Sequence, residues 1–283
     1  MTVSYETSKK MLLDAQKGKY AVAAFNAENM EMVIAIVQKA EEMRAPVMIQ
    51  TTPSTLKYAA PAMYRAMVKT LADKATVPVC MHLDHGNSVA LANECLTDGY
   101  SSVMIDGSKL VLDKNIALTK EVVISAKKYG IPVEGELGSV GGKEDDTEGG
   151  NGYTIPSEAV FFVKETHIDS LAVGIGTAHG IYKTTPVLDV ERLKQIREVV
   201  DIPLVLHGAS GLSDEAVAEC IANGICKVNI ATELRQAYTE GVREFLTADA
   251  EVFDPKKYGK AAIEKVKAVV EKKILMCGCQ GKA

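Results

Sequence analysis

The sequence predicts an α/β fold, a single-domain (β/α)8 TIM barrel that spans residues 1–283. Strand-like stretches alternate with helical patterns eight times, which is typical of a parallel sheet covered by helices. Eight such units in about 230 residues favour closure of the sheet into a barrel. A doubly wound open sheet is the alternative, but it normally carries a glycine-rich turn after the first strand. The stretch AFNAENM, which follows the first strand here, contains no glycine.

The predicted elements follow one another in a regular order. An amphipathic helix at 8–17 is expected to cover the bottom of the barrel. Runs of β-formers predict strands at 20–26, 46–52, 77–87, 101–106, 132–137, 170–176, 203–208 and 227–232. Helical periodicity predicts helices at 29–44, 57–74, 88–99, 113–129, 157–166, 189–199 and 213–222. After the last strand, helices complete the chain, with a C-terminal helical tail at 254–283. No Asn-Gly hairpin signal separates two strand-like runs, because Asn151 and Gly152 lie in an irregular insertion at 138–153.

Composition restricts the class of protein. The chain is 47% hydrophobic and 24% charged, as in a globular protein with a large core, and its net charge of −5 argues against nucleic acid as a partner. The N-terminal stretch has no signal-peptide core and no apolar run has the length of a membrane span, so we expect a cytoplasmic protein without a membrane partner. The six cysteines are scattered and are interpreted as reduced residues. Cys277 and Cys279 are expected to be an incidental pair at a frayed C-terminus.

Polar side chains gather at the carboxyl ends of the predicted strands. Four of the five histidines follow three of these strands. The polar residues at the strand ends are Asn26, Thr51, Thr52, Asp84, His85, Asp106, Glu134, Glu136, His179, His207 and Asn229. The opposite ends carry no comparable set, and barrel enzymes have their active sites at the carboxyl ends. The pattern therefore predicts an enzyme.

Three of the histidines predict a metal site. His85, His179 and His207 come from different strand ends and suit Zn²⁺ or a similar borderline metal, with a fourth position open for water or substrate. Side chains alternate along a strand, so His82 is expected deeper in the barrel, with a hydrogen-bond partner. His167 precedes a strand and is expected on the surface at the bottom of the barrel.

The last two strands predict a phosphate site. Residues 207–211 follow the seventh strand and residues 229–232 end the eighth, where barrels frequently bind phosphate through backbone N–H groups. Ser210 and Thr232 would add hydroxyl donors, and Lys183 would supply a cation. The insertion at 138–153 has two interpretations: a solvated loop, or a mobile active-site loop that carries a carboxylate base over the substrate.

Six motifs in the same order give a resemblance over nearly the whole chain. HLDHG, VMIDGS, VEGELGSVGGKEDD, GTAHGIYK, LVLHGASG and KVNIATEL resemble the class II, zinc-dependent ketose-1,6-bisphosphate aldolases. This family contains fructose- and tagatose-1,6-bisphosphate aldolases. The resemblance implies a lyase that uses zinc to cleave a phosphorylated ketose reversibly to dihydroxyacetone phosphate and glyceraldehyde 3-phosphate. It also implies a homodimer or homotetramer, and in some members a monovalent cation, Na⁺ or K⁺.

The resemblance assigns roles residue by residue. His85, His179 and His207 match the zinc ligands. Asp84 matches the residue that exchanges a proton with the C4 hydroxyl, and Glu144 matches the loop glutamate that moves the C3 proton. Two carboxylates that hold a second metal position match Asp106 and Glu136. With the strand-end residues included, the substrate-binding set is Asn26, Thr52, Gly180, Lys183, Gly208, Ala209, Ser210, Asn229, Ile230, Ala231 and Thr232.

The motif NIATEL, with Ala231, looks more like the tagatose-type sequences than the fructose-type ones. Two further functions stay open: an aldolase for another phosphorylated ketose, such as an inositol-breakdown intermediate, and a non-catalytic metal-bearing subunit of a larger enzyme. A Schiff-base aldolase would need a lysine near a strand tip, whereas Lys227 is predicted to begin its strand.

Overall fold

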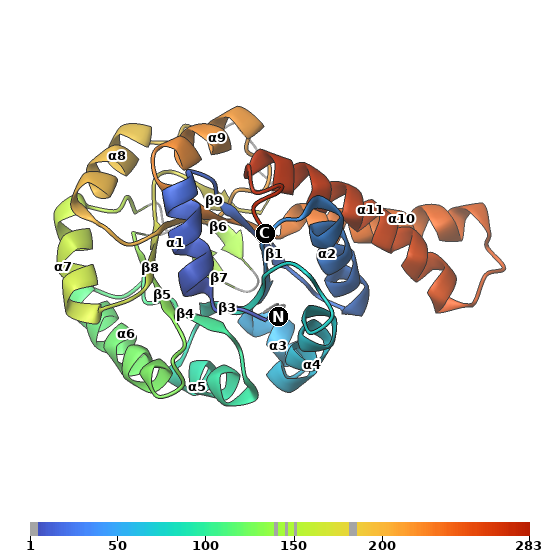
Figure 1. The fold of residues 1–283 in the computed structure, drawn as a ribbon, viewed down its shortest axis with the longest axis horizontal. Helices are drawn as coiled ribbons and strands as arrows, with labels where there is room; N and C mark the ends of the chain where they lie inside the picture. The colour runs from blue at the N-terminus through green and yellow to red at the C-terminus, as the bar shows by residue number, and fades with distance from the viewer. Residues whose placement is uncertain (1–4, 139–140, 145–146, 150–151, 181–185) are drawn as a thin grey trace.

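A computed structural model describes residues 5–138, 141–144, 147–149, 152–180 and 186–283. Its eight parallel strands close into a barrel in the order β1-β11-β10-β8-β5-β4-β3-β2, which confirms the predicted fold (Figure 1). The barrel strands are β1 Val22–Asn26, β2 Val47–Thr51, β3 Val79–Gly86, β4 Ser102–Ile105, β5 Val133–Leu137, β8 Ser170–Val173, β10 Leu204–Leu206 and β11 Ile225–Ile230. These strands are almost entirely buried, because helices cover the outside of the barrel and side chains fill its interior.

The helices surround the barrel as predicted, with one difference. They are α1 Ser8–Gly18, α2 Met30–Met43, α3 Pro53–Tyr58, α4 Pro61–Ala72, α5 Val89–Asp98, α6 Leu112–Lys127, α7 Pro156–Thr166, α8 Val190–Val199, α9 Asp214–Ala222, α10 Thr232–Ala248 and α11 Pro255–Met276. The predicted helix at 57–74 is in fact part of two helices, α3 and α4. Pro61 disfavours a helical backbone at the residue before it, so α3 ends at Tyr58 and α4 starts afresh at the proline.

Helix α1 covers the amino-terminal end of the barrel, where the sequence placed it (Figure 1). Its buried face includes Met11, Leu12 and Ala15. The side chain of Gln16 donates a hydrogen bond of 2.8 Å to the carbonyl of Asp201, just before β10 begins. This end of the barrel is therefore closed by packing, and the carboxyl end is left to carry a site.

The insertion after β5 contains a feature that the sequence did not predict. β6 Gly141–Glu144 and β7 Thr147–Gly149 pair antiparallel, and β6 also pairs with β9 Ala178–His179. The hydrogen bonds of such a ladder join backbone groups, so they do not require the alternating apolar pattern by which strands are recognised in a sequence. The absence of an Asn-Gly signal between strand-like runs therefore did not exclude antiparallel pairing here.

The C-terminus is packed rather than frayed, which corrects the sequence-based expectation. Helices α10 and α11 pack against each other and extend away from the barrel (Figure 1), and α11 also packs against α2. Beyond α11, Gly281 and Ala283 donate backbone hydrogen bonds to the carbonyls of Met43 and Arg44. Cys277 and Cys279 are buried with the other cysteines. In the described part of the chain, none of the helices has the length and apolar character of a membrane span.

Candidate active site

The tip of β3 brings two adjacent polar residues to the mouth of the barrel. Neighbouring side chains of a regular strand point to opposite faces, but the pairing of β3 with β4 shifts register between Leu83 and Gly86. His85 adopts a positive φ of 47°, and a Cβ on Gly86 would lie 2.3 Å from the carbonyl oxygen of Met104. The irregular strand end thus lets both Asp84 and His85 contribute to one site.

The imidazoles of His85 and His207 face each other. His207 directly follows β10, and its Nδ1 lies 2.9 Å from Nε2 of His85. The ring centroids are 4.5 Å apart and the rings are inclined by 72°. Asp84, His85 and His207 offer ligand atoms that all lie within 4.8 Å of one another. The structure therefore brings together three predicted residues from two strands.

Two carboxylates lie beside these imidazoles. Oδ2 of Asp106 is 3.1 Å from Nδ1 of His85, and Oε2 of Glu136 is 3.4 Å from Nδ1 of His207. Burial by itself would raise the pKa of Asp106, but the hydrogen bonds and charge of His85 and the hydrogen bonds from Ser108 outweigh it, so the pKa is lowered. His85, Asp106 and Glu136 form a second group of ligand atoms within 4.8 Å of one another. The donor set for two neighbouring metal positions is thus present.

Asp84 is held by side-chain amides at both oxygens. Asn26 of β1 donates a hydrogen bond of 2.8 Å to Oδ2, and Asn229 of β11 donates one of 2.9 Å to Oδ1. Gln50 of β2 in turn donates to Oδ1 of Asn26 at 2.9 Å, which turns the Asn26 amide toward Asp84. Gln50 was not among the predicted site residues; the available signal was a polar residue inside an otherwise apolar strand.

A layer of polar side chains lies below the mouth. His82 is buried, and its Nδ1 is 2.8 Å from Oγ of Ser102, which confirms the predicted interior position with a partner. Glu134 of β5 lies 2.9 Å from Nε2 of His207. Lys227 lies 2.9 Å from Glu134, and it is the third residue of β11 rather than the first. Its predicted place at the start of the strand is wrong, because Ile225 pairs with Leu204 of β10 and the strand begins there, two residues earlier.

The predicted phosphate-binding segments lie at the ends of β10 and β11. Gly208 has a φ of 66°, and a Cβ there would lie 2.6 Å from the carbonyl oxygen of Ala178, so this turn requires glycine. Ser210 accepts a hydrogen bond of 3.3 Å from the backbone N–H of Ala231. Thr232 is the first residue of α10, so the N-terminus of this helix lies at the end of β11.

The remaining predicted positions differ in how far they are described. Thr52, Ala209 and Ile230 are buried near the strand ends, and Thr52 caps the N-terminus of α3. Gly180 has a positive φ of 89°. Lys183 lies outside the described residues.

For Glu144 and His179 the structure describes the backbone but not the side chain. Gly142 pairs with His179 between β6 and β9, so the insertion that carries Glu144 runs beside the segment that carries His179.

Comparison with known proteins agrees with this arrangement. Residues 6–282 match the family described as fructose-bisphosphate aldolase class-II. The YdjI aldolase from Escherichia coli K12 is 38% identical, with 99% of both chains covered and a TM-score of 0.89. A putative fructose-1,6-bisphosphate aldolase from Coccidioides immitis is 32% identical, with 96% of both chains covered and a TM-score of 0.89.

A more distant structure shares the fold. Fructose-bisphosphate aldolase from Campylobacter jejuni is 22% identical, with 100% of this chain and 98% of that chain covered and a TM-score of 0.84. The match over nearly the whole length, together with the residues gathered at the mouth of the barrel, identifies the chain as a member of the class II fructose-bisphosphate aldolase family and as an aldolase, a carbon–carbon lyase.

Proposed function

We propose that this protein is a zinc-dependent aldolase that reversibly cleaves a ketose 1,6-bisphosphate to dihydroxyacetone phosphate and glyceraldehyde 3-phosphate. The observation that carries the proposal is the contact of 2.9 Å between Nε2 of His85 and Nδ1 of His207. The far nitrogen of each ring faces a carboxylate, Asp106 at 3.1 Å and Glu134 at 2.9 Å. A carboxylate only accepts hydrogen bonds, so each carboxylate accepts the proton on the far nitrogen of its ring as a hydrogen bond, and a metal ion between the two facing nitrogens would take a lone pair from each ring.

The residues fit zinc. Imidazole nitrogens and carboxylate oxygens are borderline and hard donors that suit this ion, and ligand nitrogens about 2.0–2.1 Å from a tetrahedral zinc lie roughly 3.3 Å apart. His85 and His207 would hold the ion, with His179 as the third ligand, and Asp106 and Glu136 would hold a second position. A bound Zn²⁺ supplies Lewis acidity towards the carbonyl of the ketose.

The proton transfers fall to two carboxylates of the chain. In the cleavage direction Asp84 accepts the proton of the C4 hydroxyl, the C3–C4 bond breaks, and its electron pair passes to C3 as the aldehyde leaves. Asn26 and Asn229 fix Asp84 for this step through the hydrogen bonds to its two oxygens. Glu144, on the inserted strand β6, then gives a proton to C3.

The buried polar atoms around Asp84 support a polyhydroxylated substrate. Within the described residues, Oε1 of Gln50 and Oδ1 of Asn229 are buried acceptors without a hydrogen-bond partner. Leaving such groups unpaired costs about 1–3 kcal/mol each, and sugar hydroxyls would satisfy them. The phosphate of the dihydroxyacetone unit would bind at Gly208, Ser210 and the 229–232 segment, with Lys183, and this grip would orient the reacting carbons.

The finer assignments follow the motif at the end of β11. Ala231 favours tagatose-1,6-bisphosphate over its C4 epimer, fructose-1,6-bisphosphate. We also propose a cytoplasmic homodimer or homotetramer, a monovalent cation near the phosphate, and movement of the 138–153 loop during turnover.

Chelation followed by reconstitution tests the proposal. We expect the purified chain to lose all cleavage activity on complete chelation and to regain it with Zn²⁺, with a larger kcat/KM for tagatose- than for fructose-1,6-bisphosphate. Activity that survives complete chelation, or a covalent adduct trapped by borohydride with dihydroxyacetone phosphate, would contradict zinc chemistry. If the zinc-loaded chain cleaves another phosphorylated ketose instead, the proposed substrate would be wrong and the proposed mechanism would stand.

A further inference from the structure

An ion pair beneath the mouth of the barrel takes no part in the proposed proton transfers. The side chains of Lys227 and Glu134 are 0% and 1% exposed, and Nζ of Lys227 lies 2.9 Å from Oε2 and 3.1 Å from Oε1 of Glu134. Both charges lose their hydration, and replacing such a pair by neutral residues of similar volume often leaves a protein equally stable or more stable. The pair therefore needs an explanation other than stability.

Hydrogen-bond acceptors fix the protons of this layer. Glu134 Oε1 lies 2.9 Å from Nε2 of His207, and a carboxylate only accepts, so the His207 proton is on Nε2. Lys227 Nζ lies 3.3 Å from Nε2 of His82, and an ammonium only donates, so the His82 proton is on Nδ1, next to Oγ of Ser102. The three ammonium hydrogens thus have three acceptor atoms.

Lys227 and Glu134 lie in contact as residues of opposite charge, so together they form a neutral unit in a buried interior.

We infer that Glu134 and Lys227 are positioning residues for the metal site: Glu134 holds the His207 ring with Nδ1 toward His85, and Lys227 holds Glu134. The inference rests on the proposed function, because His207 Nδ1 matters as a ligand only if a metal binds. Its Nδ1 already lies 2.9 Å from His85 Nε2 and 3.4 Å from Glu136 Oε2. A carboxylate behind a ligand imidazole fixes its tautomer and orientation, and losing such a partner typically costs about 10–100-fold in metal affinity or activity.

The same contacts argue against a nucleophilic role for Lys227. A Schiff base forms from a neutral amine with a free lone pair. Lys227 instead donates to both oxygens of Glu134 and to His82. The buried lysine thus acts through Glu134 and does not react with a carbonyl.

The test compares zinc affinity in matched variants of the full chain. Glu134→Met combined with Lys227→Met removes both charges and the acceptor for His207 Nε2, keeps side chains of similar length and leaves no unpaired ion. Lys273→Met is the control, because Lys273 is also a buried lysine, 2.9 Å from Glu233, but lies on α11 away from the metal residues. The zinc dissociation constant is measured by competition with a chromophoric chelator, folding by circular dichroism, and kcat and KM on the zinc-saturated enzyme.

We expect the double variant to fold, to bind zinc about 10–100-fold more weakly than the wild type, and to have a reduced kcat with little change in KM. Lys273→Met should keep the wild-type zinc affinity. If the double variant folds and keeps wild-type zinc affinity and kcat, the inference is overturned although the proposed function stands. A wild type that binds no zinc would instead refute the proposed function itself.

A second variant covers the case in which the double variant does not fold. Glu134→Asp keeps the charge that pairs with Lys227 but withdraws the carboxylate from Nε2 of His207 by one methylene. We expect this variant to fold and to bind zinc at least tenfold more weakly. Wild-type zinc affinity in folded Glu134→Asp would overturn the inference.

Discussion

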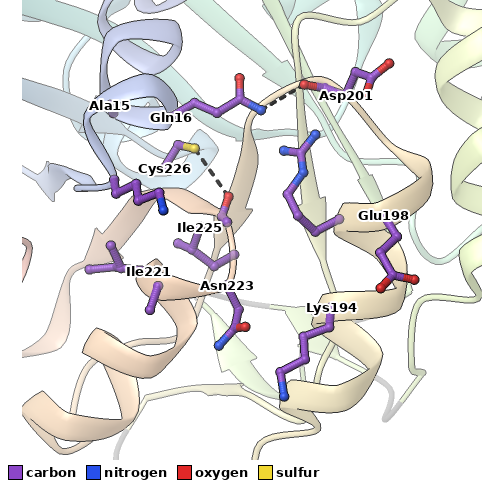
Figure 2. A pocket seen from close by; sticks show the side chains of 13 residues that line it. Ala15, Gln16, Lys194, Glu198, Asp201, Ile221, Asn223, Ile225 and Cys226 are labelled. Atoms are coloured by element: carbon purple, nitrogen blue, oxygen red, sulfur yellow. Dashed lines mark hydrogen bonds between the residues drawn. The ribbon is translucent and has the colours of Figure 1, made fainter.

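The two ends of the barrel differ in how their polar groups are arranged. At the amino end a hollow of about 520 Å³ lies between α1, α8 and α9, and Figure 2 shows Gln16 reaching the carbonyl of Asp201 there. A second hollow of about 770 Å³ at the same end is lined by Lys9, Lys120 and other lysines. At the carboxyl end, buried imidazoles, carboxylates and amides converge within hydrogen-bonding distance.

The charged groups of the amino end already have structural partners. Arg197 donates to the carbonyls of Ile202 and Val200, Lys9 pairs with Asp169 at 2.9 Å, and Lys120 pairs with Glu165 at 2.7 Å. Those ion pairs are largely exposed and contribute little energy. Convergence of buried donors and acceptors therefore identifies the reactive end of this barrel.

Replacing Asp84 should give the largest effect. We expect Asp84→Ala to lower kcat by about 10³-fold or more, because the proton acceptor for the C4 hydroxyl is lost. The variant should still bind one equivalent of zinc, measured by metal analysis after dialysis. Loss of zinc would show that Asp84, which belongs to a possible ligand group, serves as a ligand instead of a base.

A smaller effect on kcat is expected for Gln50, which contacts Asn26 and not Asp84 itself. Gln50→Met keeps the volume but removes the hydrogen bond that turns Asn26 toward Asp84. A net hydrogen-bond contribution of about 1 kcal/mol corresponds to a fall in kcat of roughly fivefold. Steady-state kinetics and zinc titration would check this, and unchanged kcat in a folded, zinc-loaded variant would remove Gln50 from the site.

At the amino end we expect stability to change and catalysis to stay the same. Arg197→Met deletes hydrogen bonds from a half-buried guanidinium to two carbonyls, which should lower the free energy of unfolding by about 1–3 kcal/mol. Urea titration measures that loss. Arg197 lies away from the reacting groups, so kcat/KM should remain within about twofold of wild type. A large loss of kcat/KM would break the contrast between the two ends.

Thiol reactivity tests the packed C-terminus with no expected effect on activity. Burial raises the pKa of Cys279 to about 11, so its reactive thiolate is scarce at pH 8. The pKa of this thiol is higher in the folded chain than in the unfolded chain. Its contribution to the free energy of unfolding is therefore fully present below the usual thiol pKa of 9.0 and is lost as the pH rises from there toward about 11. A disulfide reagent at pH 8 should modify the native chain slowly, and it should modify all six cysteines after unfolding. Rapid labelling of the native chain at Cys279 would indicate that the C-terminus opens.

Repeated strand–helix units and polar residues at strand ends could be predicted from the sequence. Features that depend on tertiary contacts could not. The alternation of strands and helices gave the barrel, and the strand-end polar residues gave Asp84, His85 and His207. Gln50 and Lys227 lie inside strands, where a polar residue has meaning only once its partners across the barrel are known. The β6–β7 pairing and the packed tail depend on backbone hydrogen bonds, which leave no periodic pattern in the sequence.

Anomalous diffraction at the zinc absorption edge, from crystals of the zinc-loaded protein, would show whether His85 and His207 share a metal ion. We predict a zinc peak between the two rings, about 2.0–2.1 Å from Nε2 of His85 and Nδ1 of His207. A fully loaded, active protein whose zinc lies elsewhere, with these two nitrogens unligated, would contradict this prediction.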